Sequence, residues 1–436
     1  MTRMWWLAAL AACGGSSSMV TPDAGMEDPV VIVPRTGITA EQVGVLVNDD
    51  DPLSVQVAEY YVTARKIPAA NVVHLRLPSA TADAMTLADF TPLRAQVTTA
   101  LASTDVQALA ITWTKPYRVD NTSITSAFAY GYRDIDNANT CNDPDSLSAG
   151  ANPYAMQRAS TRPFTDLGFR PAMSIPGTTF EEAKAIIDRG VASDGTWPDG
   201  TAYLMSTSDH IRSARCVVDA MYGYINECQK LLDVWDPVAS GVAASIVTAD
   251  SIVGKRDVMF YVQGLASVPD LATNTYLPGA VADHLTSYGG QIPTSGQMSA
   301  FEFLRAGATG SFGTVVEPCA YQEKFPNPLV LVPTYFGGAT LIEAYWKSVE
   351  WPAEGIFIGE PLARPYGTGF RTTFEGGTLA IETSTMIPNK LYAIEAADSD
   401  AGPFTVVQDQ LSVPRYQRAT FTIDGANRAV YRFVAR

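Results

Sequence analysis

The chain has 436 residues, a formal net charge of −15 and 47% hydrophobic residues. This length suffices for one large domain or two ordinary ones. The negative balance argues against nucleic acid as a partner, because phosphate binding needs a basic surface. It also argues against wide adhesion to anionic lipid headgroups. No apolar run beyond the N-terminus is long enough to span a bilayer.

Residues 1–13 have the pattern of a lipoprotein signal peptide. Arg3 precedes a short apolar run, which ends in the small residues before Cys13. The last four residues of this segment, Leu-Ala-Ala-Cys, resemble a lipobox, in which the cysteine thiol receives a diacylglycerol and becomes the mature N-terminus. The alternative is an ordinary secretory signal with a chance cysteine. We expect an exported protein that is held to a membrane by a lipid on Cys13.

The segment 14–36 is expected to be a flexible tether. Its first half is dominated by Gly, Ser, Thr, Pro and Asp, a composition that buries too little apolar surface to fold. Gly14, rather than an aspartate, follows Cys13. By resemblance to lipoprotein sorting, this residue favours the outer membrane. We therefore expect the folded part in the cell envelope, on the periplasmic or the surface face.

Alternating strands and helices predict a parallel α/β sheet that begins near residue 37. Apolar runs at 43–48, 72–77 and 108–113 are typical of buried strands, and helices are expected after a cap at Ser54 and at 87–101. Strand, helix, strand in this order indicates a parallel sheet with helices packed on its faces. The stretch 114–170 breaks the alternation and is expected to be an inserted lobe.

The alternation resumes after residue 170 and gives way to a different pattern after residue 366. Strands are expected at 202–206, 243–247, 258–262, 311–316 and 356–358, and helices at 178–190, 208–232, 278–288, 297–305 and 341–349. Six β-type segments separated by turns then predict a small antiparallel β-sandwich over 367–436. The predicted fold class is a doubly wound, mostly parallel α/β domain over 37–366, followed by this sandwich.

Four cysteines remain when Cys13 is set aside. An even number in an exported chain suggests two disulfides, for which three connectivities are possible. We favour Cys216–Cys228, because these residues are near in sequence, and Cys141–Cys319, because both lie in loop-like segments. The alternative is free thiols.

Two local patterns resemble caspase- and gingipain-like domains. The segment 298–317, with Gly307-Ala308 between a helix and an apolar strand, resembles a unit of those domains, and 355–362 is similar to the segment that closes the gingipain-type domain. The strings at 48–54, 277–280, 283–290 and 314–319 resemble a family of exported bacterial proteins of uncharacterised function. The resemblance covers the chain to about Tyr366. It implies a caspase/gingipain-like core and no known activity.

The peptidases of this kind need His-Gly after one strand and Cys after the next, since the thiolate attacks the carbonyl and the histidine moves the proton. In this sequence Gln263-Gly264 occupies the first position and Thr286-Ser287 the second. We therefore predict a pseudo-peptidase that acts in binding or scaffolding. Its ligand would be a protein, a peptide or a glycan, bound in a cleft with Gln263, Thr286 and Ser287.

A second register makes the chain a cysteine endopeptidase with a dyad of His284 and Cys319. Their separation in sequence is plausible for the fold. However, His284 is expected in a helical stretch, and Cys319 follows the strand that a nucleophile should precede. A disulfide at Cys319 would exclude this hypothesis.

A third hypothesis is a hydrolase that uses a divalent cation. Asp49 and Asp51 follow the first strand, at the usual ligand edge of an open α/β sheet, and carboxylates there could bind a cation and contribute to the ligand cleft. The alternative is a solvated turn with carboxylates favoured near a helix N-terminus.

Other patterns are absent from the sequence or carry structural roles. Asp209-His210 lies beside Ser208, but no Gly-x-Ser-x-Gly elbow surrounds that serine, so a capping role is expected for Ser208 or Asp209. There is no glycine-rich phosphate loop and no zinc pattern. The sequence predicts no cofactor and no resident metal.

Overall fold

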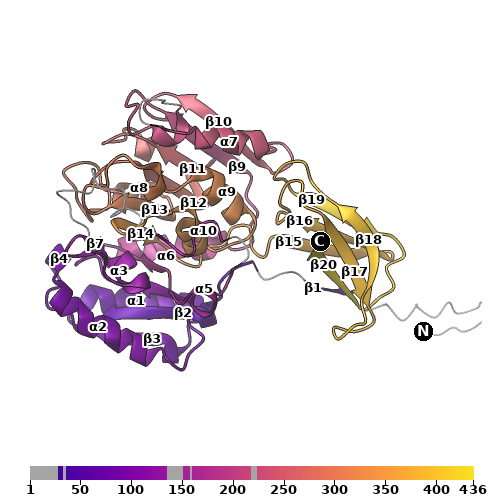
Figure 1. The fold of residues 1–436 in the computed structure, drawn as a ribbon, viewed down its shortest axis with the longest axis horizontal. Coiled ribbons are helices and arrows are strands. Elements are labelled where there is room, and N and C mark those ends of the chain that lie inside the picture. Colours follow the sequence, from indigo (N-terminus) through magenta and orange to yellow (C-terminus); the bar gives the residue numbers. More distant parts are fainter. Residues whose placement is uncertain (1–27, 33–35, 135–150, 158–159, 218–222) are drawn as a thin grey trace, which may run out of the picture.

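The computed structural model describes residues 28–32, 36–134, 151–157, 160–217 and 223–436. A large α/β lobe carries the indigo to orange part of the chain, and a smaller yellow β lobe lies beside it (Figure 1). Cys13, most of the expected tether and Cys141 lie outside the described residues. In the described part of the chain, no helix is both long and apolar enough to cross a membrane.

One ten-stranded sheet forms the centre of the large lobe, in the order β10-β9-β11-β12-β13-β14-β8-β5-β2-β3. The strands of the N-terminal half are β2 (Val43–Asn48), β3 (Val72–Leu75), β5 (Ala108–Ile111) and β8 (Ala172–Ser174). The others are β9 (Gly200–Ser206), β10 (Val242–Thr248), β11 (Val258–Gln263), β12 (Tyr276–His284), β13 (Gly310–Thr314) and β14 (Gly355–Gly359). A small separate sheet joins β4 (Ala84–Met85), β6 (Arg118–Val119) and β7 (Thr122–Ser123).

The direction of the sheet reverses once, between β13 and β14. These two strands pair antiparallel, while the other pairs in the sheet are parallel. The sheet therefore consists of two parallel half-sheets that run in opposite directions. In one half β2 lies between β3 and β5, and in the other half β9 lies between β10 and β11. In both cases the strand that comes first in the sequence lies between the next two, as in doubly wound folds.

Glycines make this reversal possible, because backbone segments approach closely at the seam. A Cβ on Gly313 would lie 2.4 Å from the carbonyl carbon of Gly289, in the segment that follows β12. A Cβ on Gly359 would lie 2.4 Å from the carbonyl oxygen of Thr309, and Gly359 has φ +142°. A side chain at Gly359 would push the two half-sheets apart, and one at Gly313 would push β13 away from the segment after β12.

Helices cover both faces of the sheet and bury two hydrophobic cores. The first face is packed by α1 (Pro52–Arg65), α6 (Phe180–Ser193), α7 (Glu227–Val234), α9 (Pro328–Phe336) and α10 (Leu341–Ser348). The second face is packed by α2 (Leu87–Ala100), α3 (Ile124–Tyr130) and α8 (Phe301–Ala306). A short α5 (Pro163–Leu167) lies in the connection before β8. This is the three-layer arrangement expected for a mostly parallel sheet.

The smaller lobe is a sandwich of two sheets around its own core. One sheet has the order β1-β20-β17-β18 and the other β15-β16-β19. The strands are β1 (Val30–Ile32), β15 (Phe370–Glu375), β16 (Thr378–Thr383), β17 (Tyr392–Ala397), β18 (Thr405–Leu411), β19 (Ala419–Ile423) and β20 (Val430–Ala435). The fold class predicted from the sequence, a mostly parallel α/β sheet followed by a small antiparallel sandwich, is confirmed.

The N-terminal segment contributes to this sandwich, contrary to the expectation of a tether over 14–36. Val30, Val31 and Ile32 form β1 and pair parallel with β20. Val31 packs against the sandwich core, and this contact supplies the apolar burial that the tether prediction overlooked.

Two helix predictions in the second half are wrong. The expected helix 278–288 is mostly β12, a strand whose last six residues are all buried. A strand buried on both faces shows no alternation, so periodicity does not separate it from a buried helix. Among its described residues, the expected helix 208–232 has the 3-10 turn η3 (Ala214–Cys216) and the start of α7, and a disulfide joins Cys216 to Cys228 within this stretch.

The expected insertion 114–170 is partly core. Phe128 of α3 packs edge-on against Phe90 and Trp113, and the Ser126 hydroxyl donates to the carbonyl oxygen of Pro352 beside β14. This part of the stretch therefore belongs to the core of the large lobe and not to a separate inserted lobe. Ser54 also differs from the prediction, since Asp51 caps α1 and the Ser54 hydroxyl accepts from the amide of Asn48.

A buried ion pair joins the end of α1 to the segment after β14. The guanidinium of Arg65 contacts the fully buried carboxylate of Glu360, with Nη2 2.5 Å from Oε2. We expect Arg65→Met to destabilise the fold by about 3–5 kcal/mol, because it leaves a buried charge without a partner. Urea unfolding measures this change. Arg76→Met is the control, since Arg76 forms an exposed pair with Asp50, worth about 1 kcal/mol or less. An equal loss of unfolding free energy in Arg65→Met and Arg76→Met would contradict this account.

Candidate functional site

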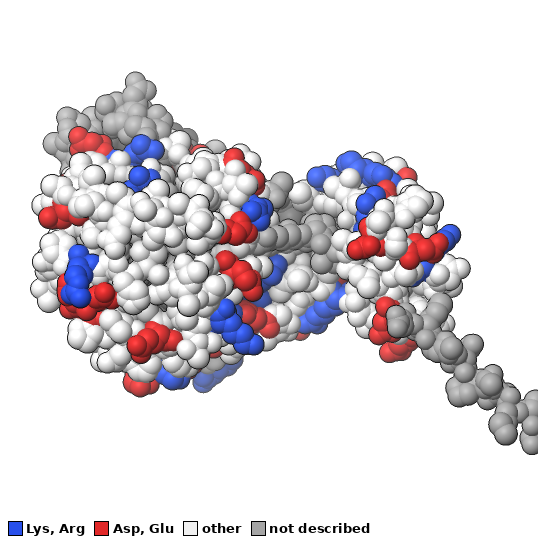
Figure 2. All heavy atoms as spheres, turned by 90° about the horizontal axis from the view of Figure 1, so that it is seen from below, with Lys and Arg blue, Asp and Glu red and all other residues white. Residues whose placement is uncertain are grey.

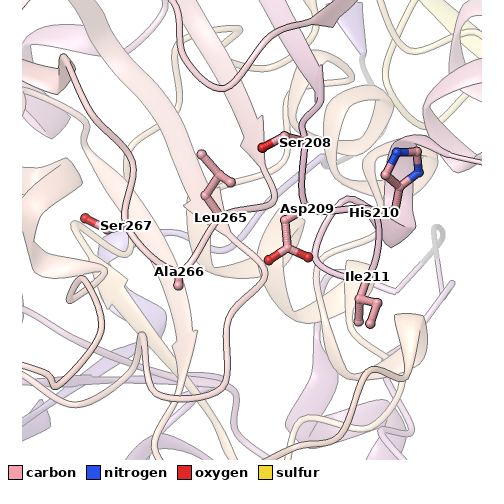
Figure 3. A pocket seen from close by; sticks show the side chains of 7 residues that line it. All are labelled: Ser208, Asp209, His210, Ile211, Leu265, Ala266 and Ser267. Carbon is pink, nitrogen blue, oxygen red and sulfur yellow. The ribbon is translucent and has the colours of Figure 1, made fainter.

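A hollow lies at the carboxyl ends of β9 and β11. The chain leaves β9 towards β10 on one side and leaves β11 towards β12 on the other, so a crevice is expected between the two strand ends. The structure has a hollow of about 690 Å³ there, lined by Ser208, Asp209, His210, Ile211, Leu265, Ala266 and Ser267. Figure 3 shows that one wall follows β9 and the other follows β11. This is the candidate site, called below the switch-point hollow.

The wall after β9 is held by side-chain hydrogen bonds. Asp209 accepts from the backbone amide of Arg212 at 3.0 Å and from the guanidinium of the same residue at 2.6 Å. Ser208 donates to Asp250, the residue two positions after β10, at 2.9 Å. The hydroxyl of Ser208 points away from the ring of His210 (Figure 3), so these residues do not form a catalytic triad. The capping role expected for Asp209 fits its bond to the amide of Arg212.

Gly264 lets the two walls approach each other. A Cβ at this position would lie 2.3 Å from the carbonyl oxygen of Arg212 and 2.7 Å from the Cα of Ser213. The hydroxyl of Thr207 donates to the carbonyl oxygen of Gly264 at 2.7 Å and closes the base of the hollow. Glycine after β11 is therefore required by the backbone packing of the site.

Gln263 ends β11 and pairs in register with His284, the last residue of β12. Its side-chain nitrogen donates to the carbonyl oxygen of Asp250 at 2.7 Å and to the hydroxyl of Tyr261 at 3.1 Å. Its side-chain oxygen accepts from the amide of Gly264. All of its polar groups are thus engaged in joining the ends of β10 and β11, and none is presented to a substrate.

His284 lies at the end of a strand, not in the helix that the sequence suggested. Its ring is fully buried, and Nδ1 donates to the carbonyl oxygen of Leu265 at 2.9 Å. Nε2 is buried without a hydrogen bond of good geometry, and the ring packs against Phe303. Burial is the main cause that lowers the pKa of His284 to about 4. The imidazole is neutral at pH 7 and fixes the wall after β11 to the end of β12.

A buried ion pair supports the same strand ends from the other face. Arg215 contacts Asp283 at 2.5 Å and donates to the carbonyl oxygen of Gln263 at 2.7 Å, and both charged side chains are 1% exposed. Arg215 precedes Cys216, whose disulfide with Cys228 holds the loop in place. This disulfide matches the predicted pairing.

Thr286, which with Ser287 was expected at the position of the nucleophile, does not bond a histidine or a carboxylate through its hydroxyl. The Thr286 hydroxyl donates to the side-chain oxygen of Gln297 at 2.5 Å and accepts from Nε of Arg212 at 3.2 Å. The backbone carbonyls of Thr286 and Ser287 both accept from the hydroxyl of Thr314. Thr286 is buried and its role in this structure is to connect three loops.

Cys319 is disulfide-bonded in this structure, so its sulfur is not a free nucleophile. Cys141, its expected partner, lies outside the described residues. With the sulfur oxidised and the imidazole of His284 buried, the dyad of the peptidase hypothesis is not assembled.

The aspartates after β2 do not belong to the switch-point hollow. Because the two half-sheets run in opposite directions, the carboxyl end of β2 and those of β11 and β12 lie at opposite edges of the sheet. Asp49 pairs with His74 at 2.6 Å, and Asp51 caps α1. No group of three potential metal ligands is found among the described residues. The cleft that combined Asp49 and Asp51 with Gln263 and Thr286 is therefore wrong.

Sequence reasoning missed Arg212 and Arg215, which hold the site together. Both follow β9 in a segment that was assigned to a helix, and their acidic partners, Asp209 and Asp283, give no local signal of pairing. The adjacent Cys216 was the available clue, because a disulfide loop is incompatible with one long helix.

The fold defines a doubly wound α/β domain followed by a β-sandwich. No protein-family model matches the chain, and no curated protein matches its sequence. Similar solved structures include the complex of the pro- and mature domains of RgpB from Porphyromonas gingivalis, with a TM-score of 0.41, 9% identity, and coverage of 91% of this chain and 99% of that chain. Another is described as a protease, with the same TM-score and identity, and coverage of 89% of this chain and 98% of that chain. At these values neither similarity carries an inference about activity.

The buried imidazole of His284 makes the free energy of unfolding depend on pH. The pKa of His284 falls from 6.5 to about 4 on folding, so the unfolded chain binds a proton in this range that the folded chain does not. Wild type should lose about 3 kcal/mol relative to His284→Asn as the pH falls from about 6.5 to about 4. Urea unfolding across this range measures the difference. His210→Asn, at an exposed histidine, controls for the loss of an imidazole. A difference that does not change with pH would refute the buried neutral state.

Proposed function

We propose that the α/β domain is a non-hydrolytic peptide-binding domain whose ligand occupies the switch-point hollow. The observation that carries this proposal is the hydrogen bonding of the residues at the end of β11 and after β12. Gln263 has every polar group engaged, and the Thr286 hydroxyl bonds Gln297 and Arg212 and not a histidine or a carboxylate. These are the positions at which the gingipain resemblance would require a histidine and a thiol.

The lining of the hollow favours a peptide. Ile211, Leu265 and Ala266 provide apolar surface, while Ser208, Asp209, His210 and Ser267 provide donors and acceptors around it. A backbone segment with one apolar side chain matches this mixture, since binding sites combine an apolar surface with a few placed polar groups. On the face seen in Figure 2, acidic and basic side chains are interspersed, with no broad basic surface of the kind nucleic acid needs.

Blocking the hollow should abolish binding. The probe is a mixture of tryptic peptides of casein, observed by saturation-transfer NMR. Ile211→Arg places a long charged side chain in the hollow and should weaken binding about tenfold or more, or ~1.4 kcal/mol. Ile225→Arg is the matched control, because Ile225 is 49% exposed and Ile211 43%. Equal binding by wild type and Ile211→Arg would overturn the assignment of this site.

The same mixture tests catalysis. Mass spectra of the casein peptides should show no new fragments after incubation with the protein, with or without a thiol reductant. Fragments that appear with wild type and disappear with His284→Ala or Cys319→Ala would establish a peptidase and refute the non-hydrolytic proposal.

We also propose that the chain is exported and anchored to the outer membrane by a lipid on Cys13. Support comes from the lipobox pattern of the sequence and from the position of β1, which lets the preceding segment leave from the sandwich lobe and not from the hollow. An anchored molecule would then present the α/β lobe away from the point of attachment.

Cys13→Ser should move the protein from the membrane fraction to the soluble fraction in a Gram-negative host. The loss of the acylated sulfur removes the only covalent hydrophobic anchor that the proposal includes. Ser18→Ala, in the same segment, should leave the protein in the membrane fraction. Mass spectrometry of the mature N-terminus provides the second measurement, and an unmodified Cys13 would refute lipidation.

A further inference from the structure

The wall after β11 is fixed through its carbonyl groups. The carbonyl oxygen of Leu265 accepts from Nδ1 of His284 at 2.9 Å, and that of Ala266 accepts from the amide of Met298 at 2.9 Å. Among the residues that the structure describes, the amides of Ala266 and Ser267 have no acceptor, and neither has the hydroxyl of Ser267. This wall of the switch-point hollow is therefore anchored on one side and leaves hydrogen-bond donors unused on the other.

The peptide planes fix the direction in which these two amides point. In a trans peptide the N–H and the preceding C=O point in opposite directions, and both peptide bonds within 265–267 are trans. The carbonyl of Leu265 points towards His284 at the end of β12, so the amide of Ala266 points away from β12. The carbonyl of Ala266 points towards Met298, between β12 and α8, so the amide of Ser267 points away from that segment. This direction leads towards the wall after β9, because β11 lies between β9 and β12, and both residues line the hollow (Figure 3).

The opposite wall shows which group such a set of donors binds. There the amide and the hydroxyl of Ser208 donate to the two carboxylate oxygens of Asp250, at 2.7 and 2.9 Å. Ser267 offers the same two donors, and the amide of Ala266 adds a third. Hydrogen bonds to a carboxylate are about twice as strong as those between neutral groups, and successive backbone amides form concave sites for anions. The unused donors therefore favour a carboxylate over a neutral carbonyl group.

The charges around the hollow are compatible with a carboxylate. Asp209 is the acidic residue in its lining, and Arg212 neutralises this carboxylate in an ion pair of 2.6 Å. Asp250 does not belong to the lining. The net charge of −15 is spread over the whole chain, and salt screens exposed charges that lie beyond about 8 Å at physiological ionic strength. The ligand is thus held by hydrogen bonds of short range and not by a basic surface.

We propose that the switch-point hollow captures the C-terminal carboxylate of its peptide ligand, with the amides of Ala266 and Ser267 as donors. Ile211 and Leu265 supply apolar surface in the same hollow, so an apolar side chain next to the carboxylate fits there. The C-terminal residue is the part of a peptide that carries a carboxylate and an apolar side chain on one Cα. Capture of this group by backbone amides is a general mode of peptide recognition. The proposal rests on the peptide binding proposed above and specifies which end of the peptide enters.

Three small probes test the proposal and separate the possible sources of the carboxylate. N-acetyl-leucine carries the carboxylate and the apolar side chain, and N-acetyl-leucinamide lacks the carboxylate. The α-amide of N-acetyl-glutamate carries a carboxylate on its side chain alone. In saturation-transfer titrations of the full chain, N-acetyl-leucine should bind about tenfold more tightly than either of the other two probes.

Two variants at one position test the donors. Ser267→Pro removes the amide donor, and it breaks no hydrogen bond of the fold because this amide has no partner in the described protein. It should weaken the binding of N-acetyl-leucine about tenfold. Ser267→Ala is the matched control, since it keeps the amide and removes the hydroxyl, and it should bind more tightly than Ser267→Pro. Urea unfolding shows whether both variants are folded. If Ser267→Pro does not fold, the amide signals of Ala266 and Ser267 in wild type provide the measurement, because N-acetyl-leucine should shift them and N-acetyl-leucinamide should not.

The outcomes separate this proposal from the proposed function. Equal binding of N-acetyl-leucine and its amide, tighter binding of the glutamate derivative, or unchanged binding by folded Ser267→Pro would each overturn capture of the C-terminus. Failure of N-acetyl-leucine to bind while casein peptides bind would overturn it as well. In all of these cases peptide binding itself would stand, whereas failure of wild type to bind any casein peptide would refute the proposed function.

Discussion

The antiparallel contact between β13 and β14 is the constraint on which the rest of the large lobe depends. It joins two half-sheets of opposite direction, and Gly359 lets the backbone pack closely there. Because of this reversal, the strand ends that carry Gln263 and Thr286 and the strand end that carries Asp49 lie at opposite edges of one sheet. The molecule thus has two separate ligand edges where the sequence suggested one, and the chemistry of each has to be considered by itself.

The two half-sheets repeat one arrangement at their switch points. In the first, the hydroxyl of Ser54 accepts from the amide of Asn48 at the end of β2. In the second, the hydroxyl of Ser213 accepts from the amide of Thr207, directly after β9. In both cases a serine six residues further along the chain turns the backbone back over the end of the first strand. The halves differ in the element that holds this serine, because Ser54 lies in a regular helix and Ser213 lies in an irregular segment just before the disulfide-bonded Cys216. The irregular loop of the second half leaves room for the hollow.

Secondary structure could be predicted from the sequence where a segment shows a regular hydrophobic pattern or a capping residue. It could not be predicted where a segment is buried on all sides and so shows no alternation of apolar and polar residues. The run at 43–48 and the helix that follows were predicted because an uninterrupted apolar strand precedes a capped helix. β8 was missed since its three residues, Ala172–Ser174, are too few to show a pattern. β12 was taken for a helix because Asp283 and His284 look like a polar face, whereas both are buried against partners distant in sequence. Gln263 and Cys319 were singled out as a cleft residue and a nucleophile, whereas the structure engages the first in hydrogen bonds and the second in a disulfide. The arginines that organise the hollow could be found only from the three-dimensional pairing.

The pairing of β1 with β20 has a consequence for how the protein is made. β1 precedes the α/β lobe in the chain and β20 follows it, so β1 is synthesised well before its partner. The sandwich therefore cannot close before β20 is synthesised, and β1 has no partner strand until then. Closing so long a loop is slow and entropically unfavourable compared with local pairing. The edge of the sandwich therefore stays incomplete until β20 has been made and has met β1.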